Sequence, residues 1–134
     1  MTNEELCNMA VTAMDHSYSP YSGYRVGAAL ETSDGLTFTG CNIENASFSP
    51  TVCAERTAVF KAISEGHTKF RAIAIAGGKN GKITGIFPPC GVCRQVLAEF
   101  CSSDFLILLV KPDGYETHTL GEFLPFGFSP DHVS

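Results

Sequence analysis

Two short segments of the chain combine residues that can bind and use a metal ion. Residues 53–56 read Cys-Ala-Glu-Arg and residues 88–94 read Pro-Pro-Cys-Gly-Val-Cys-Arg, each at the predicted start of a helix. Cys90 and Cys93 are three residues apart, so both sulfurs can face the same side of the first helical turn. Cys53 can add a third thiolate, and the unpaired N–H groups at a helix start favour thiolates because they carry partial positive charge.

Three cysteine ligands leave the fourth position of a tetrahedral zinc ion for water, which is typical of a catalytic site. Glu55 follows Cys53 by two residues, so we expect it near the metal without ligating it, where it can move protons. Zinc with three thiolates carries a net charge of about −1, which weakens the ion as a Lewis acid. Arg56 and Arg94 can donate hydrogen bonds to the sulfurs and draw charge off them, and we expect at least Arg56 to do so.

The cysteines could also form a redox pair or a structural zinc site. A lone Cys-x-x-Cys can be a redox pair or half of a structural zinc site. A redox pair is expected after the first strand of a thioredoxin-like unit, and here it comes late in the chain. A structural site needs a fourth ligand, and none of the candidates shows knuckle spacing: Cys7, Cys41, Cys101 and His67. The Cys-Ala-Glu sequence at a helix start favours the catalytic interpretation.

Length and composition predict one folded domain over residues 1–134. The chain is 44% hydrophobic and 17% charged, which supports a packed core and excludes global disorder. Its formal net charge of −5 argues against binding to nucleic acid or to an anionic membrane, both of which need a basic face. The longest apolar run, residues 105–110, is too short to span a bilayer, and residues 1–15 lack the features of an export signal. We therefore expect a cytoplasmic protein with reduced cysteines.

The elements that must position these residues follow from periodicity and turn signals. Thr2 and Glu5 form a capping box before a helix, Asp34-Gly35 marks a hairpin turn, and Gly66 closes the second helix. Residues 77–89, rich in Gly, Lys and Pro, are expected to form a loop. We predict helices over residues 3–16, 53–66 and 90–101, strands over 26–31, 36–41, 70–76, 105–110 and 115–119, and then a short helix and an aromatic tail. This order favours a mixed sheet layered with helices, an α/β fold.

The motifs taken together resemble those of the cytidine deaminase family. Pro-Cys-x-x-Cys with an upstream Cys-x-Glu is the three-cysteine form of the zinc deaminase signature. The segments that carry the resemblance cover nearly the whole chain: residues 24–29, 40–46, 53–58 and 89–95, Leu124-Pro125 and the aromatic tail. The chain is similar to the short, single-domain form of the family. The resemblance implies a three-layer α-β-α fold with a five-stranded mixed sheet, and a homotetramer.

For the site, the resemblance implies one zinc ion per chain, held by Cys53, Cys90 and Cys93. Glu55 matches the proton shuttle that serves N3 of the pyrimidine and the leaving ammonia. The implied activity is hydrolytic deamination of cytidine and deoxycytidine to uridine and deoxyuridine plus ammonia, in pyrimidine salvage.

The resemblance also assigns residues to the nucleoside. Asn42 and Glu44 match the residues that hold the ribose 3′-hydroxyl. Ala54 offers its peptide N–H to the base carbonyl. The aromatic residues implied at the site are Tyr24, where the family commonly has Phe, Phe48, and Phe128, which reaches the base from a neighbouring subunit. We expect Phe126, by contrast, to pack in the core or within the tail.

The sequence leaves three other functions open. A related deaminase could act on another aminopyrimidine, such as a nucleoside antibiotic, although residues 24–29 and 42–46 favour the ordinary nucleoside. A non-enzymatic zinc module would have a closed, four-ligand site. Editing of a polynucleotide is disfavoured, because a long strand needs a cationic channel and this chain is acidic.

Overall fold

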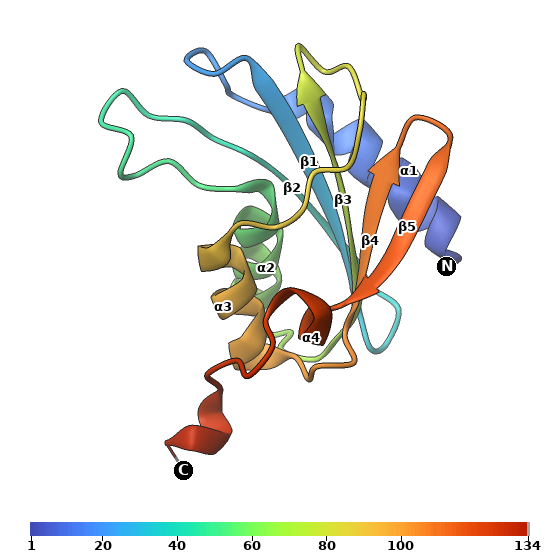
Figure 1. The fold of residues 1–134 in the computed structure, drawn as a ribbon, viewed down its shortest axis with the longest axis vertical. Coiled ribbons are helices and arrows are strands. Elements are labelled where there is room, and N and C mark those ends of the chain that lie inside the picture. Colours follow the sequence, from blue (N-terminus) through green and yellow to red (C-terminus); the bar gives the residue numbers. More distant parts are fainter. Residues whose placement is uncertain (134) are drawn as a thin grey trace.

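A computed structural model describes residues 1–133, so the last residue of the expected domain, Ser134, lies outside the described part. A five-stranded sheet and four α-helices form the body (Figure 1). The helices are α1 (Asn3–Ala13), α2 (Ala54–Ser64), α3 (Gly91–Phe100) and α4 (Leu120–Phe123), and the strands are β1 (Tyr24–Thr32), β2 (Thr37–Cys41), β3 (Phe70–Lys79), β4 (Leu106–Lys111) and β5 (Gly114–Thr119). A 3-10 turn at Met14–His16 follows α1, and a second one at Pro130–His132 comes after α4.

The sheet is mixed, as the sequence predicts. Its strand order is β2-β1-β3-β4-β5, and only β3 and β4 run parallel among the described pairs. Helix α3 lies in the connection between these parallel strands, as a crossover requires. The start of α3 is thereby brought near the start of α2, on the same side of the sheet (Figure 1).

Alternating side chains of the strands build two cores, one on each face of the sheet. In β3, Ile73 and Ile75 join the core that α2, α3 and α4 cover. The residues between them, such as Ala74, join the core against α1. Because buried side chains fill both faces, the predicted three-layer α-β-α architecture is confirmed.

Most predicted elements are present with boundaries within three residues, and part of one predicted loop is strand. Thr2 and Glu5 make both bonds of the expected capping box at the start of α1. Strand β3, however, runs through residues 77–79, which the Gly-rich sequence predicted as loop. These residues pair with β1 from Val26 back to Tyr24, so ladder hydrogen bonds outweigh the poor strand propensity of glycine.

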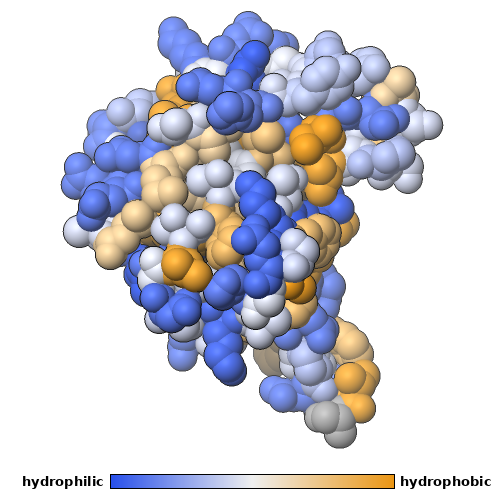
Figure 2. Space-filling model, turned by 180° about the vertical axis from the view of Figure 1, so that it is seen from behind, coloured by the Kyte–Doolittle hydropathy of each residue, from blue (hydrophilic) through white to orange (hydrophobic). Residues whose placement is uncertain are grey.

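The chain ends in a segment that leaves the body. Residues 125–133, here called the C-terminal arm, project beyond α3 and α4 and stand off the rest of the surface in both views (Figure 1 and Figure 2). Phe126 lies in this arm with its side chain fully exposed, so the expectation that it packs in the core or within the tail is wrong. Its backbone φ of 56° is left-handed, and the arm offers it nothing to pack against. Within residues 1–133, none of the helices has the length and apolar character that a membrane span requires.

Candidate functional site

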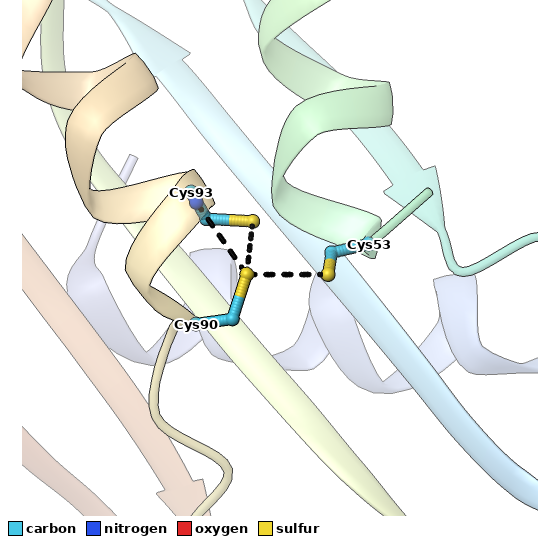
Figure 3. A group of neighbouring side chains, drawn as sticks. All are labelled: Cys53, Cys90 and Cys93. Atoms are coloured by element: carbon cyan, nitrogen blue, oxygen red, sulfur yellow. Dashed lines mark hydrogen bonds between the residues drawn. The ribbon is translucent and has the colours of Figure 1, made fainter. Parts of the chain in front are cut away.

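Three cysteine side chains meet where α2 and α3 begin. The Sγ atoms of Cys53 and Cys90 lie 3.5 Å apart, and those of Cys90 and Cys93 lie 3.4 Å apart. Figure 3 shows the Cys53 sulfur, from the start of α2, pointing toward the two sulfurs of α3. Among residues 1–133, this is the one group of at least three potential metal ligands whose ligating atoms all lie within 4.8 Å of one another.

Local structure explains why these cysteines converge. Cys53 and Cys90 both occupy N-cap positions with extended backbone, so each side chain projects from a helix start. Cys93 lies in the first turn of α3, and its backbone N–H donates to the Cys90 sulfur at 3.4 Å. A tetrahedral zinc ion with bonds of about 2.3 Å to sulfur spaces its ligands by about 3.8 Å. The observed separations come within a few tenths of an ångström of that spacing, so these residues fit zinc.

The pKa values of the thiols also indicate a metal site. The pKa of Cys53 is lowered to about 5, chiefly because the Cys93 thiol donates to it and also because Arg56 does. The pKa of Cys93 is raised, chiefly because its proton is held in the bond to Cys53. Three thiolates cannot stand this close together unless a cation balances them. The donor set therefore suits a divalent metal ion.

Arg56 lies beside the sulfurs as expected. Its Nη2 donates to the Cys53 sulfur across 3.5 Å. Its Nε is buried and has no hydrogen-bond partner within residues 1–133. The guanidinium thus brings positive charge to the ligand cluster.

Arg94 donates to main-chain carbonyl oxygens rather than to the cysteine sulfurs. Its Nε donates to the Pro89 carbonyl and its Nη1 to the Phe123 carbonyl, both at 2.8 Å. The guanidinium also lies over the Phe123 ring, 4.9 Å from the centroid. The bond to a sulfur that the position of Arg94 allows is absent from the described contacts. The two carbonyls attract the guanidinium away from the metal ligands, and it instead links the segment before Cys90 to the end of α4.

Glu55 is buried in the first turn of α2, with 4% of its surface exposed. Burial raises the pKa of its carboxyl to about 7, and the charge of Cys53 adds to this rise. A carboxyl group with this pKa can both accept and donate a proton at neutral pH. Its location beside the cysteine cluster is the one that a proton shuttle needs.

The comparisons with known proteins agree with this site. Residues 1–109 match the family described as cytidine and deoxycytidylate deaminase zinc-binding region. The chain belongs to this deaminase family. As a member it is an enzyme, a hydrolase with a zinc cofactor, and Cys53, Cys90 and Cys93 are the residues whose geometry could hold that ion.

Relatives of this deaminase match it along almost its full length. It is 43% identical to a cytidine deaminase of Sporosarcina psychrophila over 135 aligned residues, covering 100% of this chain and 96% of the relative. A cytidine deaminase of Halalkalibacterium halodurans is 42% identical, with 100% and 99% covered. The crystal structure of a cytidine deaminase from Burkholderia pseudomallei superposes with a TM-score of 0.87 at 40% identity, covering 96% of this chain and 100% of that one.

Asn42 and Glu44 of the deaminase hold the loop around them. The Asn42 Oδ1 accepts from the Val26 N–H at 2.9 Å and from the Ser17 hydroxyl, and its Nδ2 donates to the Tyr24 carbonyl at 2.8 Å. One N–H of the Asn42 amide remains, because these bonds use a single amide hydrogen.

Glu44 binds the turn that precedes β1. Its Oε1 accepts from the N–H groups of Tyr21 and Ser22, at 2.9 and 3.1 Å, and its Oε2 accepts from the Ser22 hydroxyl. The Ser22 hydroxyl bond is the main cause that lowers the pKa of Glu44, so the carboxylate stays ionised. Ser17, Tyr21 and Ser22 could not be predicted as partners, because no local motif joins them to residues 42–44.

Aromatic side chains of the deaminase lie exposed near these loops and, separately, in the C-terminal arm. The Tyr24 ring lies 5.9 Å from that of Phe87, a contact that the sequence did not signal. Phe48 is 71% exposed and packs edge-on against Tyr21, with 6.1 Å between ring centroids. Phe128 lies in the C-terminal arm, where 58% of it is exposed. These rings offer apolar surface that a nucleoside could cover.

Proposed function

We propose that this deaminase hydrolyses cytidine and deoxycytidine to uridine and deoxyuridine, with release of ammonia, in pyrimidine salvage. Water adds at C4 of the base, the bond from C4 to the amino nitrogen breaks, and ammonia leaves. The observation that carries the proposal is the cluster of three sulfurs at two helix starts with buried Glu55 beside it. The relatives named cytidine deaminase support the choice of base.

The residues of the cluster divide the work. Cys53, Cys90 and Cys93 would hold zinc, which would supply a water activated at neutral pH, because the ion lowers the pKa of bound water to about 7. Glu55 would accept the first proton of the attacking water and pass it to N3 of the pyrimidine. It would then take the second proton from the new hydroxyl at C4 and deliver it to the amino group, which leaves as ammonia. Its raised pKa of about 7 suits it to both directions of transfer. Arg56 draws charge from the Cys53 sulfur.

The remaining residues bind the nucleoside. Cys53 caps α2 without a side-chain hydrogen bond, so first-turn N–H groups such as that of Ala54 have no capping partner and can meet the base carbonyl. The remaining N–H of Asn42 and the ionised carboxylate of Glu44 can donate to and accept from the ribose 3′-hydroxyl. Since neither residue requires a 2′-hydroxyl, both ribose and deoxyribose substrates fit. Tyr24 and Phe48 flank the nucleoside.

We further propose that residues 1–134 form a single domain that assembles into a cytoplasmic homotetramer, in which Phe128 reaches the base bound by a neighbouring subunit. Support comes from exposed apolar side chains on α2, α3 and the C-terminal arm, which one chain leaves uncovered: Phe60, Val92, Phe126 and Phe128. Surfaces of this kind mark sites of association. Light scattering of the purified protein tests the number of subunits.

One preparation can test the activity. We expect about one zinc per chain, and cytidine should lose its ultraviolet absorbance while ammonia appears in equal amount. Glu55→Gln should keep the zinc and lose at least about 1,000-fold in kcat. The matched control is Glu65→Gln, which changes an exposed carboxylate at the end of the same helix and should leave kcat unchanged. Full activity of Glu55→Gln would refute the mechanism, and turnover of a nucleoside antibiotic in place of cytidine would refute the substrate.

A further inference from the structure

The C-terminal arm is weakly attached to the body. A hollow of about 490 Å³ separates Ser129 and Pro130 from residues 98–103 at the end of α3, so close packing does not fix that part of the arm. Hydrogen bonds inside the arm are local: the backbone N–H of Ser129 donates to Nδ1 of His132 at 3.1 Å. The Phe128 ring stacks on the His132 ring, with 5.3 Å between centroids and 17° between planes.

One hydrogen bond joins this arm to the body within residues 1–133. The Nε2 of Gln95 donates to the Phe128 carbonyl, and the two atoms lie 2.9 Å apart. Gln95 is an exposed residue of α3, two positions after the zinc ligand Cys93. The bond joins this exposed amide to a main-chain carbonyl 33 residues away, so it ties the arm to α3 at Phe128.

The neighbouring residue strengthens this arrangement. Arg94 holds the Phe123 carbonyl, just before the arm begins, while Gln95 holds the Phe128 carbonyl within it. Two successive side chains of α3 thus bind the main chain at both ends of residues 123–128. Because Cys90 caps α3 and Cys93 lies in its first turn, the helix that positions two metal ligands also sets where the Phe128 ring lies.

We propose that Gln95 is a positioning residue of this deaminase. By holding the Phe128 carbonyl, it orients the arm so that the Phe128 ring can cover a nucleoside bound by a neighbouring subunit. The role of Phe128 rests on the proposed function, whereas the attachment of the arm does not. Loss of the amide donor frees the arm, and the nucleoside then binds more weakly. The reacting atoms stay in place, because Gln95 touches neither the cysteines nor Glu55 in the described contacts.

Steady-state kinetics of the zinc-loaded enzyme test this role. Gln95→Glu keeps the shape of the side chain and removes its N–H donors, so it should raise KM for cytidine about threefold to tenfold. The value of kcat should stay within about twofold, with the same zinc per chain and the same number of subunits. In a Phe128→Ala background, Gln95→Glu should have no further effect on KM. An equal rise in KM in both backgrounds, or an unchanged KM, would overturn the proposal.

A second measurement does not depend on activity. The chain contains no tryptophan, so Phe128→Trp places a single fluorescent reporter in the arm. Adding Gln95→Glu to this variant should lower the steady-state anisotropy of the reporter, because the arm moves more freely. Equal anisotropy with and without Gln95 would show that the bond does not hold the arm. If the wild type fails to turn over cytidine, the proposed function is wrong, and the anisotropy still decides whether Gln95 holds the arm.

Discussion

Arg56 donates from Nη2 to the sulfur of Cys53, three residues earlier in the chain, and the two atoms lie 3.5 Å apart. Residues three apart lie on the same side of a helix, so the start of α2 brings a metal ligand and a cation together without help from the rest of the fold. The bond draws negative charge from the sulfur. Charge withdrawn from a ligand leaves the metal a stronger Lewis acid.

Replacing Arg56 should therefore impair the reaction more than the binding of zinc. We expect Arg56→Gln to lower kcat for cytidine about 10-fold to 100-fold, because the thiolates keep more of their charge. Arg56→Lys keeps the positive charge without the planar fork and should lose less. Kinetics together with zinc analysis of the same samples check this. Wild-type turnover in Arg56→Gln would show that the charge of the cluster does not limit the reaction.

Arg94 should act on stability rather than on charge at the metal. Arg94→Met removes two charge-assisted bonds to carbonyls and the contact with the Phe123 ring. Such bonds contribute about 1.5–3 kcal/mol each when buried, and Arg94 is partly exposed, so we expect a loss of about 1–3 kcal/mol in the free energy of unfolding. Denaturant titration measures this loss, and transfer of zinc to a chromogenic chelator should be faster. Unchanged stability would contradict the prediction.

The contrast between these arginines shows what a sequence can predict. The Cys90–Cys93 pair, the place of Glu55 and the Arg56 contact depend on positions within one helical turn, which spacing determines. Cys53 meets Cys90 across 37 residues, and the combined family motif rather than local spacing predicted that contact. The partners of Arg94 and Asn42 depend on segments that only the tertiary structure brings together: Phe123 lies 29 residues from Arg94, and Val26 lies 16 residues from Asn42. Local patterns carry no information about such pairs.

The extension of β3 was unpredictable for a related reason, and it yields a stability test. A Cβ atom on Gly78 would lie 1.8 Å from the backbone carbonyl oxygen of Lys82, in the turn that follows the strand. The turn can fold back this closely only because residue 78 has no side chain. Gly78→Ala should lower the free energy of unfolding by about 1–3 kcal/mol and lower Tm. Gly85→Ala is the matched control, since a Cβ atom there would meet no atom within 4 Å.

His118 should make stability depend on pH. Its Nδ1 lies 2.8 Å from a Glu122 oxygen and its Nε2 lies 2.9 Å from a Glu116 oxygen. These two bonds raise the pKa of His118 above its ordinary value of 6.5, and the bond to Glu122 has the larger effect. A raised pKa in the folded state means that the stabilisation is complete below the ordinary pKa and is lost as the pH rises through the raised one.

The substitution His118→Gln should therefore lower Tm more at about pH 5.5 than at about pH 9. Thermal denaturation at the two pH values measures the difference. His16→Gln serves as the control, because no hydrogen bond involves the His16 ring among the described contacts. A deficit for His118→Gln that is the same at both pH values would contradict the assigned bonds.

After removal of the metal, the cysteine thiols should be alkylated at clearly different rates. Burial raises the pKa of Cys7 to about 11 and that of Cys101 to about 12, so both remain protonated and unreactive near neutral pH. Cys90 is exposed, and Cys53 has a pKa of about 5. In the zinc-loaded protein the metal should protect both. After chelation, Cys53 and Cys90 should react with iodoacetamide at least about tenfold faster than Cys7 and Cys101 at about pH 7.5.

Peptide mass spectrometry over a time course measures each rate. Restoring zinc before alkylation should protect Cys53 and Cys90 again, which separates loss of the metal from loss of the fold. Rapid labelling of Cys7 or Cys101 would mean that chelation unfolds the protein. If Cys53 and Cys90 reacted equally fast with and without zinc, they would not be ligands, and the metal would have to be held elsewhere.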